Sequence, residues 1–266
     1  MDDKRLSQAI VRLVNLAARL RGPGGCPWDA KQTDQTVKNY LLEEAYEVVD
    51  AIDRGDAQLV CAELGDLLFQ IIFLAELASE RGEFEFADVV EKIEEKMIRR
   101  HPHVFGQVKV KDADEVAKNW ARIKETEKGG ESRKGIKALM DIPLSLPALL
   151  RCHRICERAS KMNFEISRIE SPLKLIEKGL KVLQDLDEKR LTPEKEQTLG
   201  CALFGFVEAV RECGGNTEDL LRKAVERFLL MVEAVEEALE ADGLSLGNAS
   251  DEQIKAVWKK VKEDIS

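Results

Sequence analysis

The stretch LLEEAYEVVDAIDRGDAQLVCAELGD, residues 41–66, decides the fold of this chain. Its apolar residues recur every three or four positions, which is the spacing of one face of an α-helix. Gly55 favours a helix end and Asp56 can cap the helix that follows, so the stretch predicts two antiparallel helices joined by a tight turn. We expect these helices over about Thr36–Asp53 and Ala57–Arg81. The residues expected to face inward on the first are Val37, Leu41, Ala45, Val48 and Ile52.

The same stretch carries a cluster of carboxylates. Glu43, Glu44 and Glu47 share one side of the first helix, and Glu63 and Asp66 share one side of the second. Both groups lie at similar distances from the turn and are flanked by apolar residues, so the five acids should face each other, partly buried. Clustered carboxylates in such a place take up protons or bind cations, and hard oxygen ligands suit Mg²⁺ or Mn²⁺. A solvated charged face is the alternative, but it leaves acids among core residues unexplained.

Outward from this stretch, the whole chain reads as helical. Patterns over 4–21 and 86–100 add two helices with short connections, which predicts a four-helix bundle. We expect an all-α chain with a first domain at 1–127, a linker at 128–140 and a second domain at 141–266. The halves share three ordered matches, which predict a duplicated unit: Leu64–Phe69 with Leu199–Phe204, Glu95–Met97 with Glu226–Phe228, and Trp120 with Trp258.

Composition excludes several classes of function. The net charge of −9 argues against a nucleic-acid polymer as partner, because such binding neutralises phosphates with Lys and Arg. The longest apolar stretch, 67–77, is broken by Gln70 and Glu76 and predicts no membrane span. The N-terminus lacks the pattern of a signal peptide, so we expect a cytoplasmic protein with reduced cysteines. Cys152 and Cys156 share a helix face, where core packing is favoured over a zinc site.

A helical bundle that holds Mg²⁺ through carboxylates suits a phosphate ester as substrate. Lys96, Arg99 and Arg100 occupy one helical turn, and the two arginines can hold phosphate oxygens in a forked geometry. A favourable interaction with the C-terminus of their own helix is an equally good interpretation. His101 and His103 resemble a metal ligand pair, but Pro102 between them and the lack of a third ligand favour a packing role.

These segments resemble a known family. The motif at 43–47 and 63–66 resembles the Glu-Glu-x-x-Glu…Glu-x-x-Asp motif of the all-α nucleoside triphosphate pyrophosphohydrolases. The segments Gly25-Cys-Pro-Trp-Asp29, Arg99-Arg-His-Pro-His-Val-Phe105 and Asn119-Trp120 are similar to the MazG family in particular. The resemblance implies a two-domain helical homodimer with Mg²⁺-dependent hydrolysis of nucleoside triphosphates to monophosphate and pyrophosphate.

The resemblance also implies roles for individual residues. Four acids would be metal ligands, namely Glu44, Glu47, Glu63 and Asp66. Glu43 would be a further ligand or would orient the attacking water, and the sequence does not separate these roles. Lys96, Arg99, Arg100 and Trp120 would contact the nucleotide. Trp28 would stack on a base, or would be a packing anchor beside Pro27.

The second half departs from the motif. Residues 177–181 read Glu-Lys-Gly-Leu-Lys where Glu-Glu-x-x-Glu is expected, and residues 198–201 read Thr-Leu-Gly-Cys where Glu-x-x-Asp is expected. Leu230 and Met231 stand at the positions of Arg99 and Arg100. We therefore expect this copy to fold but not to catalyse, with an apolar stripe formed by Leu221, Val225, Phe228, Val232 and Val235.

Two rival functions stay open at this point. The first is a related enzyme with a narrower substrate, such as dCTP, dUTP or a guanosine tetraphosphate alarmone, because the metal chemistry would be shared. The second is a nucleotide sensor or interaction module that binds without turnover, with the degenerate half binding a partner protein or stabilising the dimer.

Overall fold

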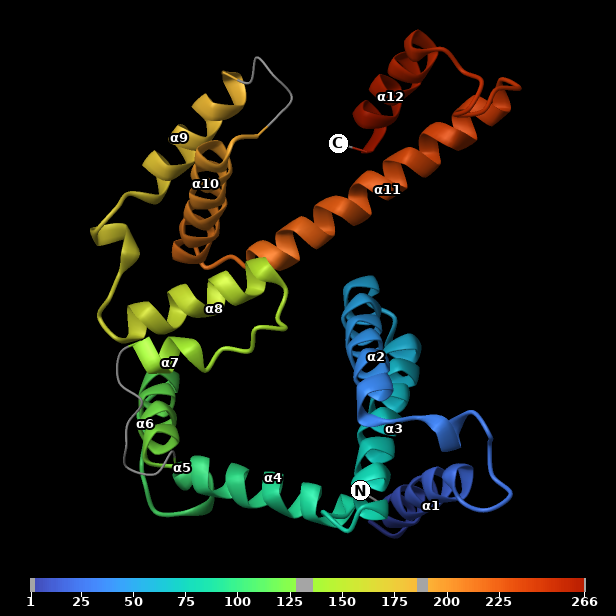
Figure 1. Cartoon of the computed structure of the whole chain (residues 1–266), viewed down its shortest axis with the longest axis vertical. Helices are drawn as coiled ribbons and strands as arrows, with labels where there is room; N and C mark the ends of the chain where they lie inside the picture. The colour runs from blue at the N-terminus through green and yellow to red at the C-terminus, as the bar shows by residue number, and fades with distance from the viewer. Residues whose placement is uncertain (1–2, 128–135, 186–190, 266) are drawn as a thin grey trace. The chain divides into compact units, whose positions relative to one another are not determined.

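The computed structural model describes residues 3–127, 136–185 and 191–265. These residues form helices joined by turns and contain no strand, so the all-α prediction is confirmed (Figure 1). The chain divides into two compact units, Met1–Gly130 and Glu131–Ser266. The division falls inside the predicted linker. Most of that linker, 128–135, lies outside the described residues, and its end forms a short helix, α7 (Ile136–Met140).

The first unit is built around one helical hairpin. Its helices are α1 (Asp3–Arg21), α2 (Asp34–Arg54), α3 (Ala57–Glu80), α4 (Phe86–Arg100), α5 (Pro102–Phe105) and α6 (Ala113–Thr126), with a 3₁₀ turn, η1 (Asp29–Lys31), before α2. Gly55 ends α2 with a left-handed φ of 69°, and the Asp56 carboxylate accepts hydrogen bonds from the backbone N–H groups of Gln58 and Leu59. The predicted tight turn between two helices is confirmed.

The core of the first unit lies at the open end of this hairpin, where α1 packs on α3. Its buried residues come from three helices: Ala17, Val37, Ile72, Phe73 and Leu77. Phe86, the first residue of α4, packs against the same core. The expectation that Ile52 faces inward is wrong, since its side chain is 58% exposed. Ile52 lies beside the turn, at the opposite end of the hairpin from the helix that covers the core.

Helix α3 is long and apolar enough to cross a membrane by length and composition alone. The core helix of a globular protein passes the same test, and α3 packs against α1, α2 and α4 within the first unit. Ile72, Phe73, Ala75, Leu77 and Ala78 of α3 are buried by these contacts. Only 11% of the most apolar 18-residue window of α3 is buried, so packing within the unit covers part of this apolar helix.

From α8 (Ala148–Lys161) onward the second unit follows the order of the first, except that its described residues have no short helix in the place of α5. It contains α8, the 3₁₀ turn η2 (Ile166–Arg168), α9 (Pro172–Gln184), α10 (Pro193–Glu212), α11 (Thr217–Ala241) and α12 (Asp251–Ile265). Helices α9 and α10 pack along each other as α2 and α3 do. One core cluster consists of Met231, Val235, Leu239 and Val261.

Two expectations for the second unit concern α11 and α8. The predicted apolar stripe lies on α11, where Val235 is buried and Leu221, Val225 and Phe228 are about half exposed. The cysteine pair on α8 is consistent with packing, because Cys156 is buried and both cysteines are free thiols.

Candidate metal centre

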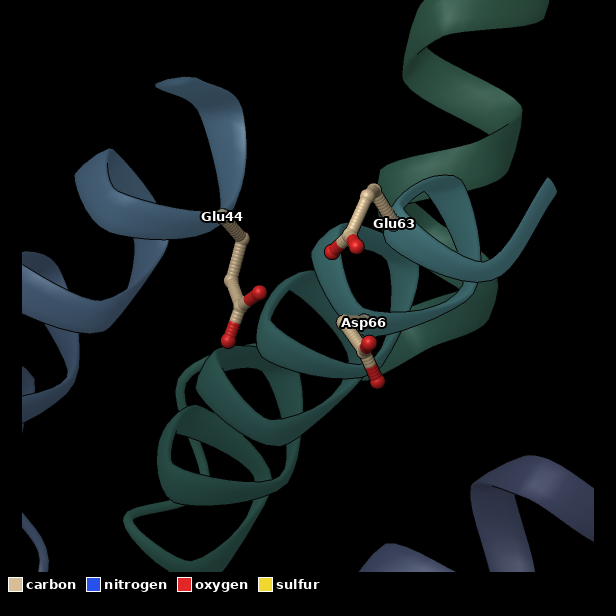
Figure 2. A group of neighbouring side chains, drawn as sticks. All are labelled: Glu44, Glu63 and Asp66. Carbon is tan, nitrogen blue, oxygen red and sulfur yellow. The ribbon is translucent and has the colours of Figure 1, made fainter. Parts of the chain in front are cut away.

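The α2–α3 hairpin brings carboxylates from both helices to one point. Figure 2 shows Glu44 on α2 directed toward Glu63 and Asp66 on α3. A ligand oxygen from each of these three residues lies within 4.8 Å of the others. Glu44 and Asp66 lie at equal distances in sequence from Gly55, so the antiparallel turn places them side by side. In the part of the chain that the structure describes, this is the one group of three or more His, Cys, Asp or Glu residues so arranged.

Burial and the negative charges of neighbouring carboxylates both make ionisation of the acids in this centre less favourable. Burial raises the pKa of Glu44, and the charges of Glu47 and Asp66 raise it further. The pKa of Glu63 is also raised, first by burial and then by Glu47 and Asp66. Glu47 therefore belongs to the same electrostatic cluster although it is exposed. Glu43 is exposed on α2 and is not part of the group of three.

A neighbour that the sequence reasoning missed is Gln70. Its side-chain amide donates a hydrogen bond of 3.3 Å to Glu44, which stabilises the ionised carboxylate and lowers its pKa. Gln70 lies seven positions after Glu63 on α3, which is two turns along the same helix face. That spacing places Gln70 on the acidic face of an otherwise apolar helix, but the choice of Glu44 as its partner depends on how α2 packs on α3.

The chemistry of this donor set fits a hard divalent cation. Carboxylate oxygens from three residues converge, and the charged groups that shift the pKa values of Glu44 and Glu63 in the described structure are other acids. A cation would remove the repulsion that raises the pKa of Glu44 and Glu63. The histidine pair does not join such a group. His101 Nδ1 lies 2.7 Å from the Met97 carbonyl and its ring contacts His103, as a packing role requires.

The predicted nucleotide contacts form a second cluster in the same unit. Arg99 and Arg100, at the end of α4, both bind the Glu127 carboxylate just after α6. Trp120 covers Arg100, whose guanidinium carbon lies 5.0 Å from the ring centre, and Lys124 lies over the same ring at 5.3 Å. Glu127 and Lys124 were not predicted. This cationic cluster is built by α4 and α6, whereas the acidic centre is built by α2 and α3.

The remaining two candidates are Lys96 on α4 and Trp28 before α2. Lys96 is half-buried on α4, one turn before Arg100. Trp28 is 57% exposed, and its ring contacts Tyr40 of α2 with centroids 5.8 Å apart. A groove of about 440 Å³ between α1, α3 and α4 contains none of the predicted site residues. The described contacts thus bring the acids together but do not join them to the arginines or to Trp28.

Comparison with known proteins decides the family. A nucleoside triphosphate pyrophosphohydrolase of Escherichia coli K12 is 39% identical over 256 residues, which cover 95% of this chain and 97% of that protein. The chain belongs to the MazG family. The MazG nucleotide pyrophosphohydrolase domain matches residues 32–105, a range that contains the acidic centre and both arginines. A second relative, the nucleoside triphosphate pyrophosphohydrolase/pyrophosphatase MazG of Thermotoga maritima, is 39% identical over 94% of each chain.

The MazG relatives extend over both units, whereas the MazG domain match is confined to the first. Among solved structures, a MazG-related protein from Thermotoga maritima aligns with a TM-score of 0.37 and 29% identity, covering 42% of this chain and 96% of that one. The suspected MazG membership is confirmed by the length and identity of the sequence matches.

Proposed function

We propose that this protein hydrolyses nucleoside triphosphates to nucleoside monophosphates and pyrophosphate with Mg²⁺, and that its first unit carries the reaction. The observation that carries the proposal is the convergence of Glu44, Glu63 and Asp66 within 4.8 Å inside the matched MazG domain. The relatives' names support the reaction class. Mn²⁺ is the expected substitute for Mg²⁺, because both prefer oxygen ligands.

The roles of the acids follow from their positions. Glu44, Glu63 and Asp66 would hold the cation, and Glu47 would complete the ligand set or hold it through water. When bound, Mg²⁺ supplies positive charge that offsets the triphosphate oxygens and favours deprotonation of a water. Glu43 is exposed on α2, and we assign it either as a further ligand or as the group that orients the attacking water. Gln70 fixes the Glu44 carboxylate.

The cationic side chains would bind the phosphates and the base. Arg99 offers an exposed guanidinium, and Arg100 is oriented by Trp120. Lys96 lies on the same helix, and we assign it to the phosphate oxygens. Trp28, with an exposed ring, is available to stack on a base.

The second unit lacks the means for this chemistry. Thr198 and Cys201 stand at the positions of Glu63 and Asp66 on α10. Met231 replaces Arg100 and is buried in a core cluster against which Trp258 packs, so the Arg–Trp contact of the first unit has an apolar counterpart here. We infer that the second unit is a degenerate copy that folds without catalysing.

A homodimer is part of the proposal. Leu42, Tyr46 and Val49 form an exposed apolar face of α2 with the spacing of one helix side. Exposed apolar faces of this kind mark protein interfaces. Tyr46→Glu should lower the mass in light scattering toward that of a monomer, while Tyr46→Phe should not. No shift in mass with Tyr46→Glu would contradict this face. We expect a cytoplasmic protein that binds neither membranes nor nucleic-acid polymers.

Pyrophosphate release from the full-length protein tests the assignment. Glu44→Gln and Asp66→Asn should each reduce Mg²⁺-dependent release by about a thousandfold, since each removes a metal ligand needed for electrostatic stabilisation. Glu177→Gln, the one acid kept at the corresponding motif of the second unit, is the matched control and should leave the rate unchanged. Full activity in both first-unit variants would overturn the assignment.

A nucleotide panel separates the two rival functions. If the protein hydrolysed only one of dCTP, dUTP or guanosine tetraphosphate, the rival enzyme with a narrow substrate range would replace the proposed broad activity. Tight binding of all nucleotides without turnover under Mg²⁺ and Mn²⁺ would favour a sensor. The proposed reaction requires pyrophosphate and a monophosphate in equal amounts.

A further inference from the structure

The two arginines at the end of α4 converge on a single carboxylate of their own chain. Arg99 Nε donates to Glu127 Oε1 at 2.8 Å. Arg100 donates to Glu127 Oε2 through Nε at 3.0 Å and Nη2 at 2.6 Å. A carboxylate held by two guanidinium groups has the contacts that a phosphate oxygen pair would have, since arginine binds both anions through the same edge.

The Arg100 edge that would receive a phosphate is therefore taken. Within the described residues, the Arg100 guanidinium donates its hydrogen bonds to Glu127. The Arg100 side chain is 10% exposed and that of Glu127 is 15% exposed, so water competes weakly for the pair. A phosphate can use this edge of Arg100 only if the Glu127 carboxylate leaves it.

A second contact, besides that with Glu127, orients Arg100. Its guanidinium lies against the ring of Trp120, at 5.0 Å from the ring centre, and the residue as a whole is buried. This cation–π contact and the surrounding packing hold the side chain in place. Glu127 thus adds an occupant to the anion site and is not needed to build it.

We propose that Glu127 is an internal competitor that occupies the polyphosphate site of Arg99 and Arg100 and sets the affinity for the nucleotide. The proposal rests on the phosphate role assigned to these arginines under the proposed function. The two arginines hold the pKa of Glu127 down at about 2, so protonation does not release the carboxylate near neutral pH. Release is driven by the incoming phosphate, which carries more negative charge than one carboxylate.

Binding of inorganic tripolyphosphate to the full-length protein tests the competitor directly. Calorimetric titrations are made with EDTA present, so that the acidic centre and its cation do not contribute. Glu127→Gln should bind tripolyphosphate about tenfold more tightly, the factor expected when one charge-assisted interaction no longer has to be broken. Glu127→Asp keeps the charge but withdraws the carboxylate by one methylene, and it should also bind more tightly than the wild type.

Two control variants isolate the contact. Glu95→Gln removes the same charge one turn before Arg99, on an exposed face of α4, and should change the affinity by less than about twofold. The double variant R99A/R100A should lose the binding. Thermal melts of all variants show that they are folded. Weaker or unchanged binding by Glu127→Gln, or wild-type binding by Glu127→Asp, would overturn the proposal.

Kinetics give an independent readout. A competitor for the substrate site raises KM without changing the chemical step, so Glu127→Gln should lower KM for a nucleoside triphosphate at unchanged kcat. A residue that merely supported the fold would change kcat or stability instead. If neither protein hydrolyses nucleotides, the proposed function fails, while the tripolyphosphate titration still decides the role of Glu127.

Discussion

The side-chain amide of Gln70 on α3 donates a hydrogen bond to the Glu44 carboxylate on α2, 3.3 Å away, and so links the two helices beside the acidic centre. The bond stabilises the ionised form of a carboxylate whose pKa is otherwise raised by burial and by Glu47 and Asp66. It gives the centre one fixed ligand direction before a cation arrives.

Gln70→Leu should weaken binding of Mn²⁺ by about tenfold, in the range typical of residues that orient metal ligands. Without the donor the pKa of Glu44 rises further, so more protons must be displaced at a given pH and the binding curve should move to higher pH. Titration followed by electron paramagnetic resonance measures both effects. Gln58→Leu, at the exposed start of α3, is the matched control and should bind as the wild type does.

Proton uptake by the centre predicts how metal binding depends on pH. The pKa values of Glu44 and Glu63 are raised, so these groups hold protons at a pH where ordinary glutamates are ionised. Mn²⁺ affinity should therefore fall as the pH is lowered from about 7 to about 5, more steeply than for a site of ordinary carboxylates. An affinity independent of pH over this range would contradict the clustering of these acids.

The raised pKa values of Glu44 and Glu63 also predict that these acids lower the stability of the metal-free protein near neutral pH. A carboxyl group with a raised pKa contributes stability below its unfolded pKa, and this contribution is lost as the pH rises through the folded value. E44Q/E63Q should therefore melt at a higher temperature than the wild type in EDTA at about pH 7, and the gap should close toward about pH 4. Added Mn²⁺ should raise the melting temperature of the wild type alone.

Neighbouring isoleucines on α3 test the placement of the core. Ile72 is 1% exposed and packs with Ala17, Val37, Phe73 and Leu77, whereas Ile71 is 38% exposed. Ile72→Ala should lower the free energy of unfolding by about 2–5 kcal/mol, the usual cost of a large-to-alanine change in a core. Ile71→Ala should cost less than about 1 kcal/mol if this face is open to solvent. Urea denaturation measures both, and equal costs would show that α3 is covered on both faces.

Much of the fold and part of the site follow from local spacing. The recurrence of apolar residues every three or four positions predicts the two helices, and Gly55 and Asp56 predict the turn between them. The register of this α2–α3 hairpin then predicts that Glu44 and Asp66 lie together. Both are short-range consequences of helix geometry, because the turn fixes which residues of two antiparallel helices are neighbours.

Burial and partner choice depend on the tertiary structure. Ile52 has the spacing of a core residue but is 58% exposed, whereas its neighbour Ala51 is fully buried, so the buried side of α2 near the turn is not the side that the spacing predicts. The sequence gives no ion-pair partner for Arg99 and Arg100. In the structure both bind the Glu127 carboxylate, which lies just after α6.

The sequence by itself determined the helices, the hairpin and the family to which the acidic motif belongs, since periodicity, caps and ligand spacing are properties of neighbouring residues. Only the tertiary structure decided that Gln70 holds Glu44 and that Glu127 occupies the arginine pair. These contacts depend on where one helix places its side chains against another, and no single-helix pattern contains that information.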